Sequence, residues 1–371
     1  MTLSERSLLT TALDELVLER QVLDRSYREI KLFDTTELCT GNKLSGPSND
    51  IQTLPLYPLH AVYLPTNGNT THTLYNTHPR NIRMALDILK QPKNDRIFCA
   101  VFSCADSGRW ASIGTILRVV DAEPHHDADG SLIRITITCK AQPIPVEIMR
   151  IDNPDAANSK AKVLQSKEYI RGQVKPRVGF DGYSSTELAS KIVNDYKAVR
   201  NFYINGIGSE QLPSFALDDL MNSLPEFDTN AVLNDFWEIA QVWQTLCYTL
   251  REGHQINLSS DRNELMVAAA RKKGGPLQLP IHVSDLLPDD RKAVGKLERE
   301  AQQVWLDTRM DPTLDFLCLL VLPIQQRNEL FASMISRERD RLTRLALFSR
   351  SGDALSGEEK RKLPRKGAWF E

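Results

Sequence analysis

A proline-rich apolar run near the N-terminus constrains the fold of this chain more than any other stretch. Residues 54–65, LPLYPLHAVYLP, place three prolines among leucines and aromatic residues. Proline has no backbone N–H donor and a fixed φ, so neither a helix nor an ordinary central strand holds such a run unbroken. The run therefore predicts two short extended segments joined at a kink, with their apolar side chains turned into a core.

The residues that follow have the alternation of strands. In 132–140, Ile135, Ile137 and Cys139 alternate with polar residues, which is typical of a half-buried strand. The runs 96–104 and 110–123 are also β-rich, Asp129 and Gly130 form a tight-turn signal, and one helical segment covers 79–89. Together these features predict a small closed or partly closed sheet.

Helical periodicity dominates the rest of the chain. Residues 3–33 predict an amphipathic helix, and helices are expected from 186, over 229–252 with Gly253 as its end, and over 288–309, 312–322 and 323–347. We therefore expect an α+β protein: an N-terminal helix and linker (1–50), a β-domain (51–150), a connector (151–185), an α-helical subdomain (186–347) and a disordered basic tail (348–371).

Composition limits the compartment and the partners. The 371 residues carry a net charge of -2, which provides no global field for nucleic acid or an anionic membrane. No apolar run reaches the about 18 residues of a membrane span. The six cysteines are scattered without a CxxC pair, so we expect reduced thiols in an intracellular compartment. The cytoplasm is the default, or a plastid or mitochondrion if the chain is a processed form.

The order of motifs in 51–150 resembles the N-terminal domain of Lon proteases. That family opens with a leucine- and proline-rich segment, which is matched here by Leu54, Pro55, Leu56, Pro58, Leu59 and Pro65. Its later V/I-G-T strand is matched by Ile113, Gly114 and Thr115. The chain departs from the family at 138–142, where a G-x-x-R type motif is absent. The resemblance implies a PUA-like pseudo-barrel in which these motif residues are structural, followed by a helical subdomain.

The resemblance, together with the missing catalytic motifs of the family, implies a non-catalytic function. Lon proteases carry ATPase and protease modules, yet this chain has no P-loop: the Gly295-Lys296 pair has Asp290 and Leu297 where glycine and Ser/Thr are required. The pair His125-His126 fits a solvated turn better than a metal site. We expect a stand-alone, non-catalytic protein with no cofactor or metal, which binds polypeptide substrates or partner proteins as an adaptor or chaperone in proteolysis or quality control.

Four residues are candidates for a peptide-binding surface, although each also fits a core position. They are Tyr63, Leu74, Tyr75 and Trp110. We expect an apolar groove between the barrel and the helices to take exposed hydrophobic segments.

Two other functions remain open at this point. PUA-like folds in other families bind RNA, and the basic connector 160–177 offers Lys160, Lys162, Lys167 and Arg171 as phosphate contacts. A ubiquitin-ligase substrate receptor of the cereblon kind also carries a Lon-type domain, but it needs a zinc-bearing module, and the missing CxxC pairs argue against it.

Overall fold

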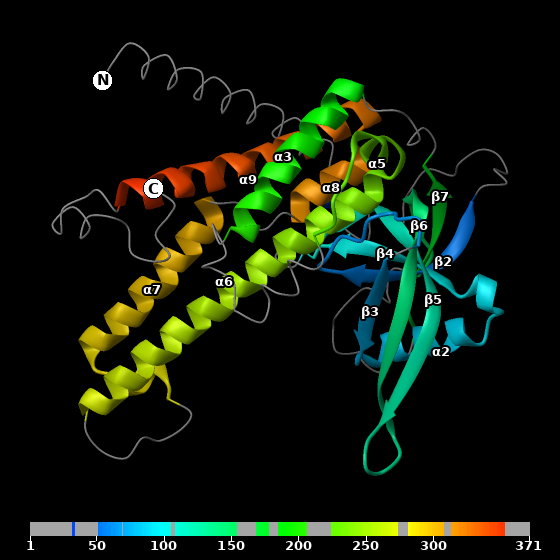
Figure 1. Cartoon of the computed structure of the whole chain (residues 1–371). Coiled ribbons are helices and arrows are strands. Elements are labelled where there is room, and N and C mark those ends of the chain that lie inside the picture. Colours follow the sequence, from blue (N-terminus) through cyan, green and yellow to red (C-terminus); the bar gives the residue numbers. More distant parts are fainter. Residues whose placement is uncertain are drawn as a thin grey trace. The chain divides into compact units, whose positions relative to one another are not determined.

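The structure is a computed structural model, and its strands and helices follow the expected change from a β-rich to a helical region (Figure 1). It describes residues 32–33, 51–68, 70–104, 108–153, 168–177, 185–205, 224–273, 281–307 and 313–352. The strands are β1 Leu32–Phe33, β2 Gln52–Leu59, β3 Thr71–Asn76, β4 Ile97–Ser103, β5 Trp110–His126, β6 Leu132–Ile151 and β7 Arg171–Pro176. The helices are α2 Pro79–Leu89, η2 Lys93–Asp95, α3 Thr186–Ile204, α5 Thr229–Asn234, α6 Phe236–Lys273, η5 Val283–Asp285, α7 Pro288–Asp307, α8 Thr313–Val321 and α9 Ile324–Gly352.

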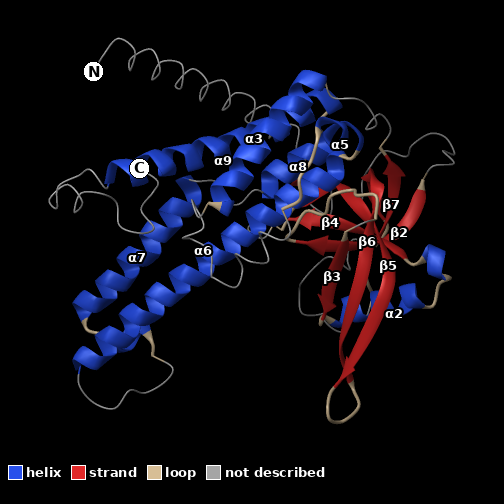
Figure 2. Cartoon of the chain, viewed as in Figure 1, coloured by secondary structure: helices blue, strands red, loops and turns tan. Residues whose placement is uncertain are grey.

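Five of the strands form a closed ring. The sheet order is β1-β5-β4-β2-β7-β6-β3, and β5 also pairs with β6, so that β5, β4, β2, β7 and β6 close on themselves. The two longest strands, β5 and β6, run together as an antiparallel hairpin that ends in the turn around Gly130 (Figure 2). Gly130 has a φ of +78°, a conformation that favours glycine. The expected closed sheet is therefore confirmed, as a barrel.

The prolines of β2 lie where this strand changes partners. Its first half, Gln52 to Pro55, pairs antiparallel with β7, and its second half, Leu56 to Leu59, pairs parallel with β4. In this register each half has a ladder partner on one side, so the missing N–H donors of Pro55 and Pro58 are tolerated. The expected two segments joined at a kink are therefore not found in that form: 52–59 is one continuous strand, and the bend follows it at 60–61.

Two apolar clusters explain why β2 and β4 are apolar without alternation. Cys99 and Val101 belong to one buried cluster, together with Trp110 and Val174, and the intervening Phe98 and Ala100 belong to another. Successive side chains of a strand point to opposite faces, so both faces of β4 are covered.

Helix α2 covers the second cluster. Met84, Ala85 and Ile88 form its buried stripe, with one-, three- and four-residue spacings, and they pack with residues of β3 and β6. Pro79 occupies the first turn, and His78 Nδ1 accepts the N–H of Arg80 at 3.3 Å, so the helix starts where the sequence predicts.

Two sequence-based expectations on the barrel are wrong. The segment 151–185 was expected to be a connector, yet it contains β7, which pairs with both β2 and β6 and completes the ring. Its residues RGQVKP alternate only at Gly172 and Val174, which is too short a pattern to indicate a strand. Leu32 and Phe33 were expected in a helix and instead pair with β5; the rest of the predicted N-terminal helix lies outside the described residues.

The chain divides into two compact units that do not follow sequence order. The first joins the barrel to 229–241 and 313–333, and the second contains 190–228, 242–312 and 334–371. Within the first unit, Arg177 directly follows β7 and donates to the Leu320 carbonyl at 3.2 Å and the Val321 carbonyl at 2.6 Å. These carbonyls end α8 and have no partner within the helix, so Arg177 fastens α8 to the barrel.

A buried arginine joins the helical parts of the first unit. The Arg327 guanidinium of α9 lies 4.4 Å from the ring centroid of Phe236 and 4.8 Å from that of Trp237, at the start of α6. Arg327 is 3% exposed, which strengthens such cation–π contacts because water does not compete for the charge.

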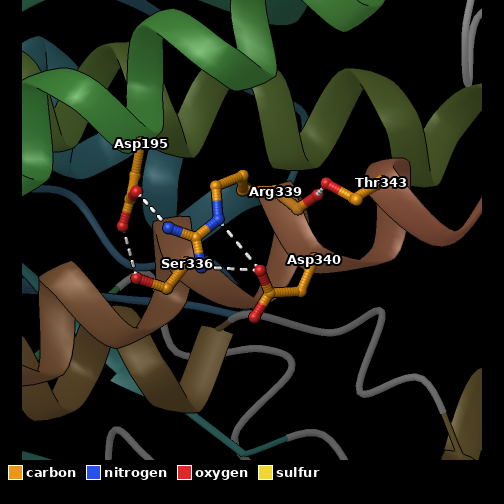
Figure 3. A network of polar contacts seen from close by, with 5 residues as sticks. All are labelled: Asp195, Ser336, Arg339, Asp340 and Thr343. Atoms are coloured by element: carbon orange, nitrogen blue, oxygen red, sulfur yellow. Dashed lines mark hydrogen bonds and ion pairs between the residues drawn. The ribbon is translucent and has the colours of Figure 1, made fainter. Parts of the chain in front are cut away.

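In the second unit, α3 and α9 are joined by partly buried polar and charged side chains (Figure 3). Asp195 of α3 accepts hydrogen bonds from Ser336 Oγ at 2.6 Å and from the Arg339 guanidinium, both on α9. Further along, Tyr203 Oη donates to Glu338 Oε1 at 2.5 Å, and Arg341 Nη2 donates to the same oxygen at 2.6 Å. These contacts set the register of α3 against α9, since sliding either helix leaves buried charges unpaired.

Helix α6 is longer than the sequence predicts. We expected an end at Gly253, but α6 continues to Lys273, because its second half packs against α7 through a cluster that includes Met266, Ala269 and Val294. One glycine costs a helix only about 1 kcal/mol relative to alanine, which such burial exceeds. Among the residues described, no helix combines the length and the apolar character of a membrane span.

The space around two glycines, one at the close approach of β4 to β5 and one on α7, predicts opposite effects of their substitution by alanine. A Cβ at Gly114 would lie 2.6 Å from the Ala100 carbonyl oxygen, whereas a Cβ at Gly295, inside α7, meets nothing within 4 Å. We expect Gly114→Ala to lower the free energy of unfolding by about 1–3 kcal/mol and Gly295→Ala to raise it by about 0.5–1 kcal/mol. Urea unfolding followed by circular dichroism measures both, and a Gly114→Ala chain as stable as the wild type would contradict the tight barrel contact.

The Glu338 cluster predicts a loss of stability in acid. Burial by itself raises the pKa of Glu338. The Arg341 guanidinium and the hydrogen bonds from Arg341 and Tyr203 lower it by more, so the pKa lies below its usual value. The contribution of Glu338 is therefore complete above its unfolded-state pKa of about 4.3, and it is lost as the pH falls through the folded-state pKa.

We expect Glu338→Gln to lower the free energy of unfolding by about 2 kcal/mol at pH 7. The loss is smaller than for a fully buried ion pair because the Glu338 side chain is 16% exposed. The difference in stability between variant and wild type should shrink as the pH falls below about 4. Urea unfolding at several pH values measures this. Glu264→Gln, on an exposed face of α6, is the matched control and should leave the pH dependence unchanged. A Glu338→Gln deficit that stays constant from pH 7 to pH 3 is the contrary result.

Candidate functional site

Several residues of the Lon-like motif pack in the core of the barrel or hydrogen-bond within it. Leu54 and Leu56 point into the first buried cluster of the barrel, and Leu59 packs against the second. Thr115 is buried and its hydroxyl donates to the Tyr63 carbonyl at 2.5 Å, which ties the proline-rich segment to β5. These motif residues therefore contribute to the core of the barrel and to its hydrogen bonds.

Two of the four candidate peptide-binding residues lie in the core. Trp110 is 4% exposed and Leu74 is 5% exposed, so neither offers a surface, because the barrel and α2 cover their faces. Tyr63 is partly buried, with its ring edge-on to His72 at 5.0 Å. Only Tyr75 is freely accessible, at 64% exposure, and the Arg134 guanidinium lies 5.6 Å from its ring centroid.

The basic connector offers few phosphate contacts where it can be described. Lys160, Lys162 and Lys167 lie outside the described residues. Arg171 lies in β7, where its guanidinium is 5.3 Å from the Tyr169 ring centroid and its backbone N–H donates to Asn153 Oδ1 at 2.7 Å.

A groove on the outer wall of the barrel gathers residues that the sequence did not single out. It is lined by 140–144 of β6, by Arg118 and Val120 of β5, and by Asn67 and Gly68 of the loop before β3, around a hollow of about 630 Å³. A hollow of this size lies within the usual range for ligand sites. The two strands that carry it, β5 and β6, are labelled in Figure 1.

A bulge in β6 forms the floor of the groove. The register of β5 and β6 steps from Leu117 opposite Ala141 to Thr115 opposite Pro145, so residues 142–144 of β6 lie opposite Ile116 alone. Bulges of this kind re-aim side chains and end regular pairing. The sequence signal that could have revealed it is the pair Pro143 and Pro145 inside a strand pattern, since proline within a strand marks a bulge or an edge.

The start of α6 holds one rim of the groove in place. Glu238 accepts the backbone N–H of Asn67 at 2.8 Å and the Thr70 hydroxyl at 3.5 Å. Gly68 has a φ of +80°, which glycine adopts without strain, so the loop turns sharply beside Lys140.

The rim and floor combine apolar surface with positive charge. Val120 is 48% exposed and Ile144 is 42% exposed, and they are two of the few large apolar side chains of the first unit that face solvent. Arg118 and Lys140 lie directly opposite each other in the β5–β6 register. The described residues that line the groove include no aspartate or glutamate.

Two titratable groups next to Lys140 in the β3–β6 ladder, His72 and Cys139, are held neutral. Burial lowers the pKa of His72 and raises the pKa of Cys139 to about 12, so at pH 7 the imidazole is unprotonated and the thiol is not a thiolate. Within the described part of the chain, no three or more His, Cys, Asp or Glu side chains are grouped to hold a metal ion.

Comparison with known proteins finds similarity only among solved structures. No family model and no curated protein matches the chain. A Lon N-terminal domain protein from Xanthomonas campestris matches with a TM-score of 0.28 and 19% identity, over 48% of this chain and 92% of that one. The N-terminal domain of a Mycobacterium avium complex Lon protease matches with a TM-score of 0.28 and 10% identity, over 47% of this chain and 78% of that one. The solved structures similar to about half of this chain thus include Lon N-terminal domain proteins, the family that its proline-rich motif resembles.

Proposed function

We propose that this chain binds segments of other polypeptides in the groove of its barrel and performs no chemistry on them. The observation that carries this proposal is the groove itself: an open hollow of about 630 Å³ whose lining joins exposed aliphatic side chains to cationic ones. Protein interfaces have this mixture of an apolar centre and a polar rim.

The apolar rim explains why an unfolded segment is the favoured occupant. Val120 and Ile144 are about half exposed on a sheet whose other large apolar side chains are mostly buried. Unfolded polypeptides expose the apolar residues that folded proteins bury, so covering these two side chains favours binding of such segments.

A passive role fits the chemical state of the barrel. Cys99 and Cys139 are buried, and burial raises the pKa of each thiol to about 12, which leaves them protonated and poor nucleophiles at neutral pH. The described cysteines are free thiols, which supports a reducing compartment such as the cytoplasm.

The biological role that follows is that of an adaptor or chaperone in proteolysis or protein quality control. Its sequence motifs resemble the Lon N-terminal domain, the region that contributes to substrate recognition in that family. RNA binding through the connector has less support, because Arg177 of that segment is engaged with the carbonyl groups at the end of α8.

Removing the apolar rim should weaken binding of an unfolded protein. We expect the double variant Val120→Ser/Ile144→Ser to bind a reduced, iodoacetamide-alkylated protein about tenfold more weakly, because it loses two half-buried aliphatic contacts worth together about 1.5 kcal/mol. Fluorescence anisotropy with a dye-labelled unfolded protein measures the dissociation constant.

The matched control is Leu86→Ser, which removes an aliphatic side chain of similar exposure (37%) from α2, outside the groove. It should bind as the wild type does. Equal weakening by both changes would point to general apolar adhesion, and hydrolysis of ATP or of the bound polypeptide by the purified chain would overturn the non-catalytic role.

A further inference from the structure

We propose that Arg118 and Lys140 form an anion subsite through which the groove selects acidic polypeptide segments, in which glutamate or aspartate is flanked by bulky apolar residues. This inference rests on the proposed function and names the chemistry of its ligand.

The two cations lie in a position that costs stability unless an anion joins them. Arg118 of β5 and Lys140 of β6 are direct cross-strand partners. Side chains that face each other in this way have Cβ atoms about 5 Å apart, and like charges at such a pair are destabilising. A carboxylate between them would convert the repulsion into two charge-assisted contacts.

The chain itself supplies no such carboxylate within its described part. Neither Arg118 nor Lys140 has an ion-pair partner there, and the groove lining contains no acidic residue. Several other basic side chains of the first unit are engaged: Arg83 and Lys90 with Asp87, Arg150 with Asp152, Arg134 with Tyr75, and Arg177 with α8. Arg118 and Lys140 therefore carry positive charge that no ion pair within the described part of the chain compensates, and the Glu238 carboxylate at the rim is engaged with Asn67 and Thr70.

The backbone of the groove floor cannot pair with a bound segment, so recognition depends on side chains. On its edge away from β5, β6 pairs with β3 up to Lys140 and with β7 from Val146 onward. Pro143 and Pro145 lie in the gap and have no N–H, so a bound segment cannot extend the sheet there by a regular ladder. Affinity must come from apolar contacts with Val120 and Ile144 and from charge at Arg118 and Lys140, which is the chemistry of an acidic, apolar segment.

A pair of matched peptides tests the charge preference. The first is a dye-labelled ten-residue peptide with two glutamates among leucine and valine, with an acetylated N-terminus and an amidated C-terminus; the second has glutamine at both positions. We expect the full-length chain to bind the glutamate peptide about tenfold more tightly at 0.05 M salt, and the preference should shrink at 0.5 M salt.

Charge-neutral variants identify the residues responsible. Arg118→Gln/Lys140→Gln should bind both peptides as weakly as the wild type binds the glutamine peptide, and its melting temperature should equal or exceed that of the wild type, because the like-charge pair is gone. Lys93→Gln removes an exposed lysine from η2, outside the groove, and should keep the preference. Val120→Ser/Ile144→Ser should weaken the binding of both peptides by a similar factor.

The outcomes separate the two proposals. If both peptides bind equally to the wild type and the Val120→Ser/Ile144→Ser variant weakens both, the acidic selection is wrong and the proposed polypeptide binding stands. If neither peptide nor an unfolded protein binds, both proposals fail. A dye-labelled oligouridylate that binds the wild type more tightly than the glutamate peptide and is lost in Arg118→Gln/Lys140→Gln would assign the cation pair to RNA and overturn the inference.

Discussion

Closure of the barrel depends on the long pairing of β5 with β6, which are otherwise separated in the sheet by β4, β2 and β7. A ring of five strands is narrow, and its interior holds a dense set of apolar side chains. The backbones must therefore approach closely, which they do at Gly114 beside the Ala100 carbonyl and at Gly172 beside the Arg150 carbonyl. Strands this long also need bulges to bend, and β5 and β6 shift register at three places.

The groove is a consequence of that bending. At the bulge opposite Ile116, β6 leaves the regular pleat and turns 142–144 outward. The pairing of β3 with β6 ends at Thr71 and Lys140, so β3 does not cover the residues of β6 that follow Lys140. The same distortion that closes the barrel thus creates a hollow with an unpaired edge, and the two prolines there protect this edge against association with other strands. The closed barrel and the groove therefore share one cause.

In the second unit, polar contacts align long helices with each other. Helices packed by aliphatic ridges alone can slide by one turn at little cost, whereas buried charges have one favourable partner. Asp195 accepts hydrogen bonds from Ser336 and Arg339 (Figure 3). Glu338 accepts hydrogen bonds from Tyr203 and Arg341. These polar contacts specify which turn of α9 meets which turn of α3.

The sequence by itself determined the local character of the chain: strands where Ile135, Ile137 and Cys139 alternate, a helix from Pro79 to Leu89, and a proline-rich run that belongs to a barrel. Those features depend on periodicity and on backbone restrictions, which neighbouring residues carry. Only the tertiary structure decided that β7 completes the ring, that Trp110 and Leu74 are core, and that Arg118 faces Lys140. These facts depend on strand register, and a shift of one residue would turn every side chain of β5 to the opposite face.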